Sequence, residues 1–248
     1  MTLRRYSAIV GAVILASVAG CGKKAPPVAI VQEEPPPSPR TNSSAGPLTV
    51  LSARPGSRMR IEGTSTVHKW QVEGRVIGGF LEVGSNFPTE PGQDVKPGKV
   101  DARAEVFITV RSLQSVEKNG AHFSDKMDET MWNNLKVNEQ PRISYRSTAL
   151  VLKDAAKSSE SPYVFDSKGE LVVAGVTNQV SMPVHVLPLG DKSLKITGSL
   201  PTRMSNFNIP VEKIGLGFVS FKTGDDVNLI FEWMVGPAKA PAAPAPPK

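Results

Sequence analysis

Cysteine is nearly absent from this 248-residue chain, in which Cys21 is the only one. A single cysteine excludes an intrachain disulfide and any metal cluster that needs several thiolates. Long apolar runs are scarce too, since the run at residues 8–19 falls short of the ~20 residues that a membrane-spanning helix needs. Aromatic residues make up only 6% of the chain, so a core has to be built mainly from Val, Leu, Ile and Met.

Motifs that carry catalysis or hold cofactors are not found either. Residues 63–67 lack the second glycine of a nucleophile elbow, and there is no His-Glu-x-x-His, phosphate-binding loop or clear dinucleotide fingerprint. The three histidines, His68, His122 and His185, stand too far apart in the sequence to indicate a metal site. The sequence therefore predicts a protein that is not an enzyme and that has no cofactor and no metal site.

The net charge of +6 at pH 7 would suit an anionic membrane surface or a nucleic acid. The basic residues, however, mostly alternate with apolar residues and form no dense run with interleaved aromatics, which argues against a nucleic-acid partner. We interpret these residues as the solvated outer face of a sheet.

The amino terminus has the features of an export signal. Arg4 and Arg5 precede the apolar run at 8–19, and small residues then lead directly to Cys21. This order resembles the lipobox of bacterial lipoproteins, which implies cleavage before Cys21 and acylation of that cysteine, for example with palmitate. An ordinary signal peptide followed by a stray cysteine is the alternative. Gly22, where an inner-membrane lipoprotein usually has Asp, implies an anchor in the outer membrane that faces the periplasm.

The prolines, 22 in all, gather toward the two ends of the chain. After a signal peptide at 1–20, the composition predicts a Pro-rich tether at 21–56, a folded domain at 57–236 and a disordered Ala/Pro-rich tail at 237–248. The middle segment is long enough for one domain with its own core.

The middle segment alternates apolar and polar residues, which is typical of half-buried antiparallel strands. Residues 100–110 and 143–151 show the pattern most clearly. Long strands of this kind favour an up-and-down barrel, because closure removes exposed edges. We therefore predict an all-β fold, an antiparallel barrel of eight to nine strands.

Between these two strands, apolar residues recur every fourth position and predict one short amphipathic helix that caps the barrel. The stripe consists of Phe123, Met127, Met131 and Leu135. Acidic residues are favoured at the start of a helix by the macrodipole, and this is how we interpret Asp125, Asp128 and Glu129. Pro141 is expected to mark the end of the helical segment.

Four groups of residues stand in order along the chain: 63–70 with 79–80; 110–113 with Met127, Met131 and 140–145; 169–171 with 174–177 and Val180; and 204–209 with 224–227. Together they resemble the YceI-like family of polyisoprenoid-binding, lipocalin-like barrels. The resemblance implies a lipocalin-like barrel whose partner is an apolar-tailed amphiphile, an isoprenoid lipid or a quinone.

The predicted ligand-binding residues are side chains assigned to the inward faces of the strands and of the helix. They are His68, Trp70, Val72, Val106, Ile108, Val110, Met127, Met131, Leu135, Ile143, Tyr145, Leu171, Val173, Phe207 and Phe218. His68 is either a hydrogen-bonded core histidine or a polar contact for a ligand headgroup. Met127 and Met131 either seal the barrel or form a flap that adapts to a lipid. Small inward residues such as Gly74 and Gly198 favour a hollow interior.

The sequence thus predicts a periplasmic, membrane-tethered protein that holds a long-tailed amphiphile in its barrel. The alternative is a non-enzymatic structural or interaction module of the cell envelope with a filled core. The volume of the interior separates the two hypotheses, because a cavity below ~300 Å³ is too small for a sizeable ligand.

Replacement of Cys21 with Ser is expected to release the protein from the membrane. The apolar run at 8–19 is too short to anchor the chain once it is cleaved, whereas each buried CH₂ of an acyl chain contributes ~0.8 kcal/mol. Fractionation of cells that express either form measures the effect. A mature Cys21→Ser protein that stayed tightly membrane-bound would contradict the lipoprotein hypothesis.

Overall fold

The computed structural model describes residues 47–211, 213–216 and 219–238. Strands dominate this part of the chain, and a single α-helix interrupts them. In chain order the elements are β1 (Thr49–Ala53), β2 (Arg58–Ser65), β3 (Lys69–Gly74), β4 (Ile77–Val83), β5 (Gly98–Lys99), β6 (Ala102–Thr109), η1 (Val110–Ser112), β7 (Leu113–Val116), α1 (Asp125–Asn134), β8 (Arg142–Asp154), β9 (Tyr163–Val173), β10 (Val176–Gly190), β11 (Ser193–Arg203), η2 (Met204–Phe207), β12 (Lys213–Leu216) and β13 (Val219–Pro237).

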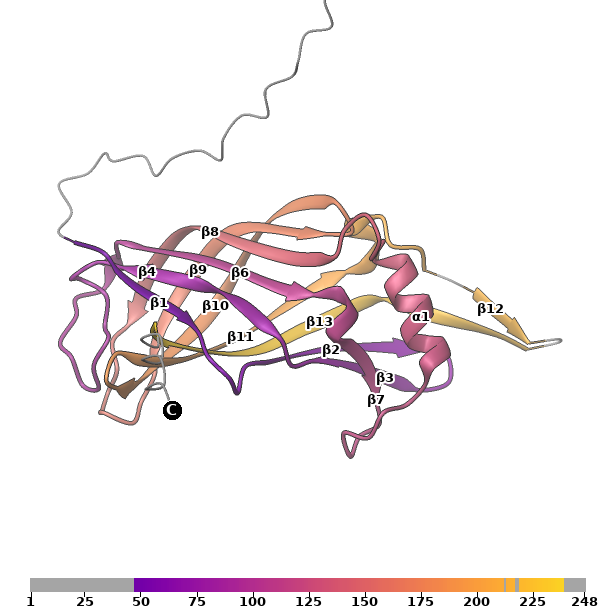
Figure 1. Ribbon diagram of the computed structural model, residues 1–248, viewed down its shortest axis with the longest axis horizontal. Helices are drawn as coiled ribbons and strands as arrows, with labels where there is room; N and C mark the ends of the chain where they lie inside the picture. Colours follow the sequence, from indigo (N-terminus) through magenta and orange to yellow (C-terminus); the bar gives the residue numbers. More distant parts are fainter. Residues whose placement is uncertain (1–46, 212, 217–218, 239–248) are drawn as a thin grey trace, which may run out of the picture. The chain divides into compact units, whose positions relative to one another are not determined.

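The sheet closes on itself as an antiparallel barrel (Figure 1). Its strands follow the order β1-β4-β6-β8-β9-β10-β11-β13, and β13 pairs with β1 to complete the ring. Within the described residues this ring has eight strands, so the prediction of an eight- to nine-stranded barrel is confirmed.

Three of these strands are bent, and each bend divides one strand into two labelled pieces. β1 continues into β2, β4 follows directly from β3, and β6 continues into β7 through η1. The pieces keep the same neighbours on both sides of the bend: β1 pairs with β4 as β2 pairs with β3, and β4 pairs with β6 as β3 pairs with β7. Counted this way, every strand of the ring lies beside its sequence neighbour, which is the up-and-down topology.

Helix α1 lies beside β7 at one end of the barrel (Figure 1). Ser124 is the N-cap, and its hydroxyl accepts a hydrogen bond from the Met127 backbone N–H at 3.4 Å. The helix ends sooner than expected from Pro141, because Lys136 already adopts a left-handed conformation with φ of 55°. Phe123 precedes the helix and is exposed, so its assignment to the apolar stripe was wrong. No helix of the described part of the chain is long and apolar enough to cross a membrane.

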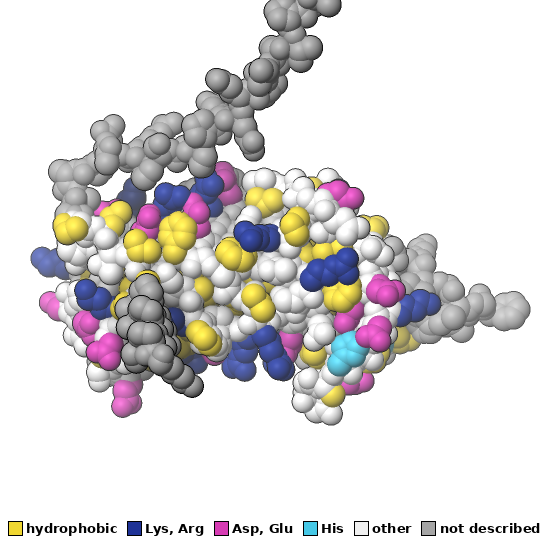
Figure 2. Space-filling model, viewed as in Figure 1, with side chains coloured by type: hydrophobic (Ala, Val, Ile, Leu, Met, Phe, Trp, Pro, Cys, Tyr) yellow, Lys and Arg dark blue, Asp and Glu magenta, His cyan; other side chains and the backbone are white. Residues whose placement is uncertain are grey.

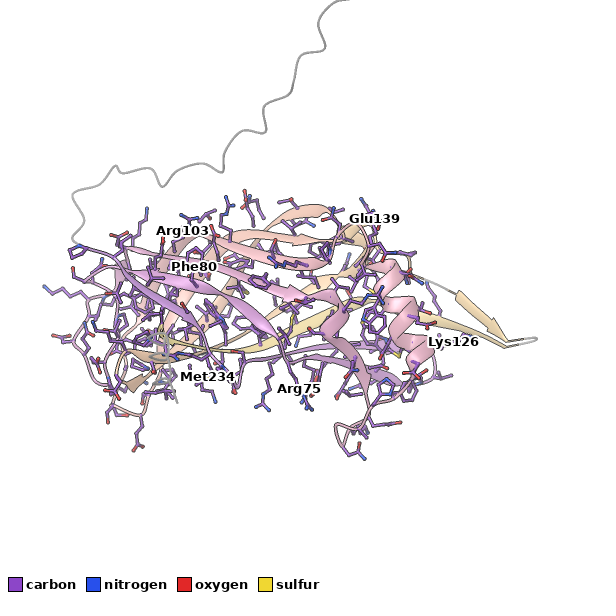
Figure 3. The ribbon with its side chains drawn as sticks, in the orientation of Figure 1. Arg75, Phe80, Arg103, Lys126, Glu139 and Met234 are labelled. Atoms are coloured by element: carbon purple, nitrogen blue, oxygen red, sulfur yellow. The ribbon has the colours of Figure 1, made fainter. Side chains whose placement is uncertain are left out.

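The alternation predicted for residues 100–110 matches the burial of their side chains. Ala104, Ile108 and Val110 are buried, Val106 is half-buried, and Arg103 projects from the outer side of β6 (Figure 3). The face in Figure 2 carries basic and acidic side chains together. Ion pairs also join neighbouring strands, such as Lys195 of β11 with Glu232 of β13 at 2.8 Å. This arrangement agrees with a solvated outer face.

The barrel interior is fuller than the small inward residues suggested. A Cβ atom built on Gly198 would lie 2.6 Å from the Phe231 ring, and one on Gly74 would lie 2.8 Å from Leu113. Large side chains on neighbouring strands therefore occupy the space that these glycines leave, as aromatic residues do over glycines in other sheets. The inference that Gly74 and Gly198 leave empty volume was wrong.

Replacement of Gly79 with Ala should destabilise the barrel strongly. Gly79 has φ of +123°, and a Cβ atom there would lie 2.0 Å from the Glu105 carbonyl oxygen on the paired strand β6. We expect the free energy of unfolding to fall by about 3 kcal/mol or more. Gly120 is the control, because its φ is +81° but nothing lies within 4 Å of the added Cβ, so strain alone should cost about 1 kcal/mol. Urea unfolding followed by tryptophan fluorescence compares the two, and equal losses would contradict the steric argument.

Candidate ligand-binding site

The barrel encloses an apolar cavity of about 110 Å³. Five of the predicted ligand-binding residues line it: Val106, Ile108, Ile143, Tyr145 and Leu171. The rest of the wall comes from strands all around the ring and includes Met59, Ile77, Leu81, Ala104, Phe107, Ser144, Leu150, Ser167, Met182, Val184, Val186, Ile196, Leu200, Leu229, Phe231 and Trp233. No Asp, Glu, Lys, Arg or His belongs to this wall among the described residues.

One polar contact stands out in this wall. The Tyr145 hydroxyl on β8 and the Ser167 hydroxyl on β9 lie 2.7 Å apart and are hydrogen-bonded to each other. Ser167 is buried, and burial raises the pKa of Tyr145, although the hydrogen bond to Ser167 opposes this shift. Tyr145 therefore stays neutral at physiological pH and keeps its proton.

Ser167 was not among the predicted ligand-binding residues, because that prediction selected mainly apolar side chains. The alternation of residues along β9 nevertheless indicates that Ser167 points inward. Ser167 occupies the same face as Phe165, Leu171 and Val173, since side chains two residues apart point the same way along a strand. Selecting every second residue of the strand, whether apolar or polar, would have included Ser167.

Several other predicted residues are buried in the core but do not reach the cavity wall. They are Val72, Val110, Leu135, Val173 and Phe207. Met127 and Met131 of α1 are partly buried against this core, and neither lines the cavity. Phe218 lies outside the described residues.

His68 was assigned to the inward face, and this assignment was wrong. His68 is exposed and lies in the turn between β2 and β3. Ser65 holds the turn: its backbone N–H donates to the His68 carbonyl at 2.8 Å, and its hydroxyl accepts from the His68 N–H at 3.2 Å. Because β3 begins only at Lys69, the parity of the strand does not extend to His68.

Trp70, two residues further on, lies over Gly63 of β2 and donates its indole N–H to the Thr64 carbonyl at 3.0 Å. It borders a second concavity, an open groove of about 690 Å³ formed by β2, β3, β11, β13 and η2. Charged and amide side chains such as Lys69, Arg203 and Asp226 dominate the rim of this groove. The groove is separate from the apolar cavity, with which it shares no lining residue.

Asp128 has a larger role than the predicted start of a helix. It is buried, and its carboxylate accepts hydrogen bonds from the Ser115 backbone N–H of β7 at 2.6 Å and pairs with His122 Nε2 at 2.9 Å. A donor set of His122, Asp125 and Asp128, whose ligand atoms lie within 4.8 Å of one another, has a geometry that could hold a metal ion. The contacts of the buried carboxylate already account for its position, because they fasten α1 to β7.

Comparison with known proteins places this barrel in a family. The family model of the YceI-like domain matches residues 56–234. The chain belongs to the YceI-like family. A comparison with curated protein sequences found no match.

One solved structure shares the fold of this YceI-like barrel, and two others are similar to parts of it. A polyisoprenoid binding domain from Saccharophagus degradans, implicated in plant cell wall breakdown, is 11% identical with a TM-score of 0.54, covering 77% of this chain and 99% of that one. BcnA of Burkholderia cenocepacia is 18% identical with a TM-score of 0.49, covering 72% of this chain and 95% of that one. A YceI protein of Campylobacter jejuni is 13% identical with a TM-score of 0.41, covering 66% and 82%.

Replacement of Asp128 with Ala should loosen α1 in this YceI-like domain. The change leaves the Ser115 N–H without its acceptor, and an unpaired buried donor costs about 2 kcal/mol. Asp125→Ala is the matched control, because that side chain is 96% exposed and should change stability by less than ~0.5 kcal/mol. Hydrogen exchange at residues 115 and 125–135 measures the effect. Equal protection in the two variants would show that Asp128 does not anchor the helix.

Proposed function

We propose that this YceI-like barrel is a periplasmic binding protein for an amphiphile with a long apolar tail, an isoprenoid lipid or a quinone-like molecule. The observation that carries the proposal is the continuous apolar wall of the internal cavity, which holds no charged side chain among the described residues. Such a wall favours a hydrocarbon tail, since burial contributes about 25 cal/mol per Å² of apolar surface. Membership of the YceI-like family and the similarity to the polyisoprenoid binding domain of Saccharophagus degradans support the same ligand class.

The role in the cell that we propose is that of a lipoprotein held at the outer membrane through Cys21. It rests on the sequence alone, on the apolar run at 8–19 and the small residues before Cys21. We propose binding rather than catalysis, because the described wall of the cavity holds no Asp, Glu, Lys, Arg or His to act as a general acid or base or to activate the Ser167 hydroxyl.

The size of the cavity favours a second candidate, a structural or interaction module with a filled core. A volume of about 110 Å³ is below the ~300 Å³ at which ligand pockets begin. For a lipid to enter, wall residues have to change rotamer and so enlarge the cavity inside the closed ring. Met59 and Met182 are suited to this, because unbranched thioether side chains adapt to irregular apolar partners.

Native mass spectrometry of the purified domain distinguishes the two candidates. A binding protein should carry a co-purified lipid, or take up an added isoprenoid quinone after delipidation, with one molecule in each barrel. A domain that carries no lipid and takes up none under these conditions would exclude the binding function and leave the structural module.

Replacement of Val106 with Asp should abolish lipid uptake. Val106 lines the cavity, and a carboxylate placed there has no cationic partner in the wall, so it is strongly unfavourable beside an apolar tail. Glu105→Gln is the neighbouring control, because Glu105 pairs with Arg103 and Arg146 on the outer face, and exposed pairs contribute only ~1 kcal/mol or less. Uptake of a quinone, with the melting temperature as a check on folding, tests both variants. Similar uptake by Val106→Asp and wild type would place the ligand outside this cavity.

A further inference from the structure

One hydroxyl hydrogen of the Tyr145–Ser167 pair in the cavity wall takes part in no hydrogen bond. Tyr145 and Ser167 each carry one hydroxyl hydrogen, and the bond between them consumes only one of the two. Neither hydroxyl has another hydrogen-bond partner among the described residues. A buried donor without an acceptor is unfavourable, so this wall offers a hydrogen bond to whatever occupies the cavity.

The position of the pair is set by the strands. Tyr145 is aligned with Leu171 in the β8–β9 pairing, while Ser167 lies four residues from Leu171 on the same face of β9. The Tyr145 ring spans this interval by lying across Gly169, where a Cβ atom would be 2.7 Å from the ring carbons. The absence of a side chain at Gly169 therefore makes room for the Tyr145 ring. This packing fixes the direction of the Tyr145 hydroxyl, which points to Ser167.

The rest of the wall restricts the ligand group that can accept this hydrogen bond. Because no Lys, Arg or His lines the described cavity, a phosphate or carboxylate would be buried there without a countercharge. An uncharged oxygen, such as a carbonyl or an alcohol, accepts the hydrogen bond without that penalty.

We infer that Tyr145 and Ser167 are a specificity determinant that hydrogen-bonds an uncharged oxygen of the bound amphiphile. The inference rests on the proposed lipid-binding function and narrows its ligand to neutral isoprenoids, such as prenols and prenyl quinones. Prenyl phosphates, which carry the same tail, are disfavoured by this site.

Three probes with one common tail test this inference: geranylgeraniol, geranylgeranyl diphosphate and the corresponding hydrocarbon that has no oxygen. Displacement of an uncharged, apolar fluorescent probe gives the affinity of each, because a probe with a carboxylate would itself be disfavoured in this cavity. Wild type should bind the alcohol about tenfold more tightly than either other probe, which corresponds to 1.4 kcal/mol. The double variant Tyr145→Phe, Ser167→Ala should lose most of the preference for the alcohol over the hydrocarbon, because it leaves only the Trp233 indole N–H as a buried donor without a partner in the described wall.

Tyr163→Phe is the control, since it makes the same chemical change elsewhere in the fold. Tyr163 is buried and donates its hydroxyl to the Gln93 carbonyl at 2.5 Å, away from the cavity wall. This variant should melt at a lower temperature while the ratio of alcohol to hydrocarbon affinity stays at its wild-type value.

Two results would overturn the inference and leave the lipid-binding function intact. One is equal affinity of wild type for all three probes, or a preference for the diphosphate. The other is an equal loss for the alcohol and the hydrocarbon in the double variant, which would show that the pair only shapes the cavity. If wild type bound none of the probes, the proposed function itself would fall, and the inference with it.

Discussion

Closure of the sheet between β1 and β13 is the constraint on which the rest of the structure depends. β13 pairs with β11 along one edge, while β2 and β1 share its other edge in succession. Because of the bend between β1 and β2, one long stretch of chain pairs with β13 near both ends of the barrel. Because a closed ring leaves no open edge, its circumference is fixed, and the interior has to be filled by the side chains that point into it.

That fixed interior explains why the cavity is small although the inward rows contain many small residues. The space beside an inward glycine stays empty only when no neighbour covers it, and Gly198 and Gly169 lie under the rings of Phe231 and Tyr145. These contacts make the barrel wall stiff and dense, as protein interiors are in general. The space that remains is a small apolar cavity of about 110 Å³, and the hydrogen-bonded hydroxyls of Tyr145 and Ser167 belong to its wall.

Strand faces were predictable from the sequence, because alternation is a local property that the barrel preserves. The burial of Ile108, Leu171 and Trp233 follows from it directly. The errors came from contacts that no local pattern contains. The turn held by Ser65 moved His68 out of its strand, and the Phe231 ring that fills the space at Gly198 lies on a different strand. The buried carboxylate of Asp128 accepts a hydrogen bond from a backbone N–H thirteen residues away in the chain. The sequence of the helix alone therefore predicted only that an acidic residue is favourable in its first turn, not that this residue is buried.

The free energy needed to separate strands β8 to β11 differs from the free energy needed to detach helix α1 from β7. This difference bears on how a lipid would enter the barrel. Strands β8 to β11 are joined by long ladders of backbone hydrogen bonds, and their separation would break many at once. Helix α1 is instead held to β7 by side-chain contacts, chiefly Asp128 with the Ser115 N–H and the Trp132 indole with the Leu113 carbonyl. Local opening is least costly where backbone pairing is thinnest. Helix α1 is thus the described element whose local opening costs the least free energy, and the anchoring carboxylate of Asp128 sets much of that cost.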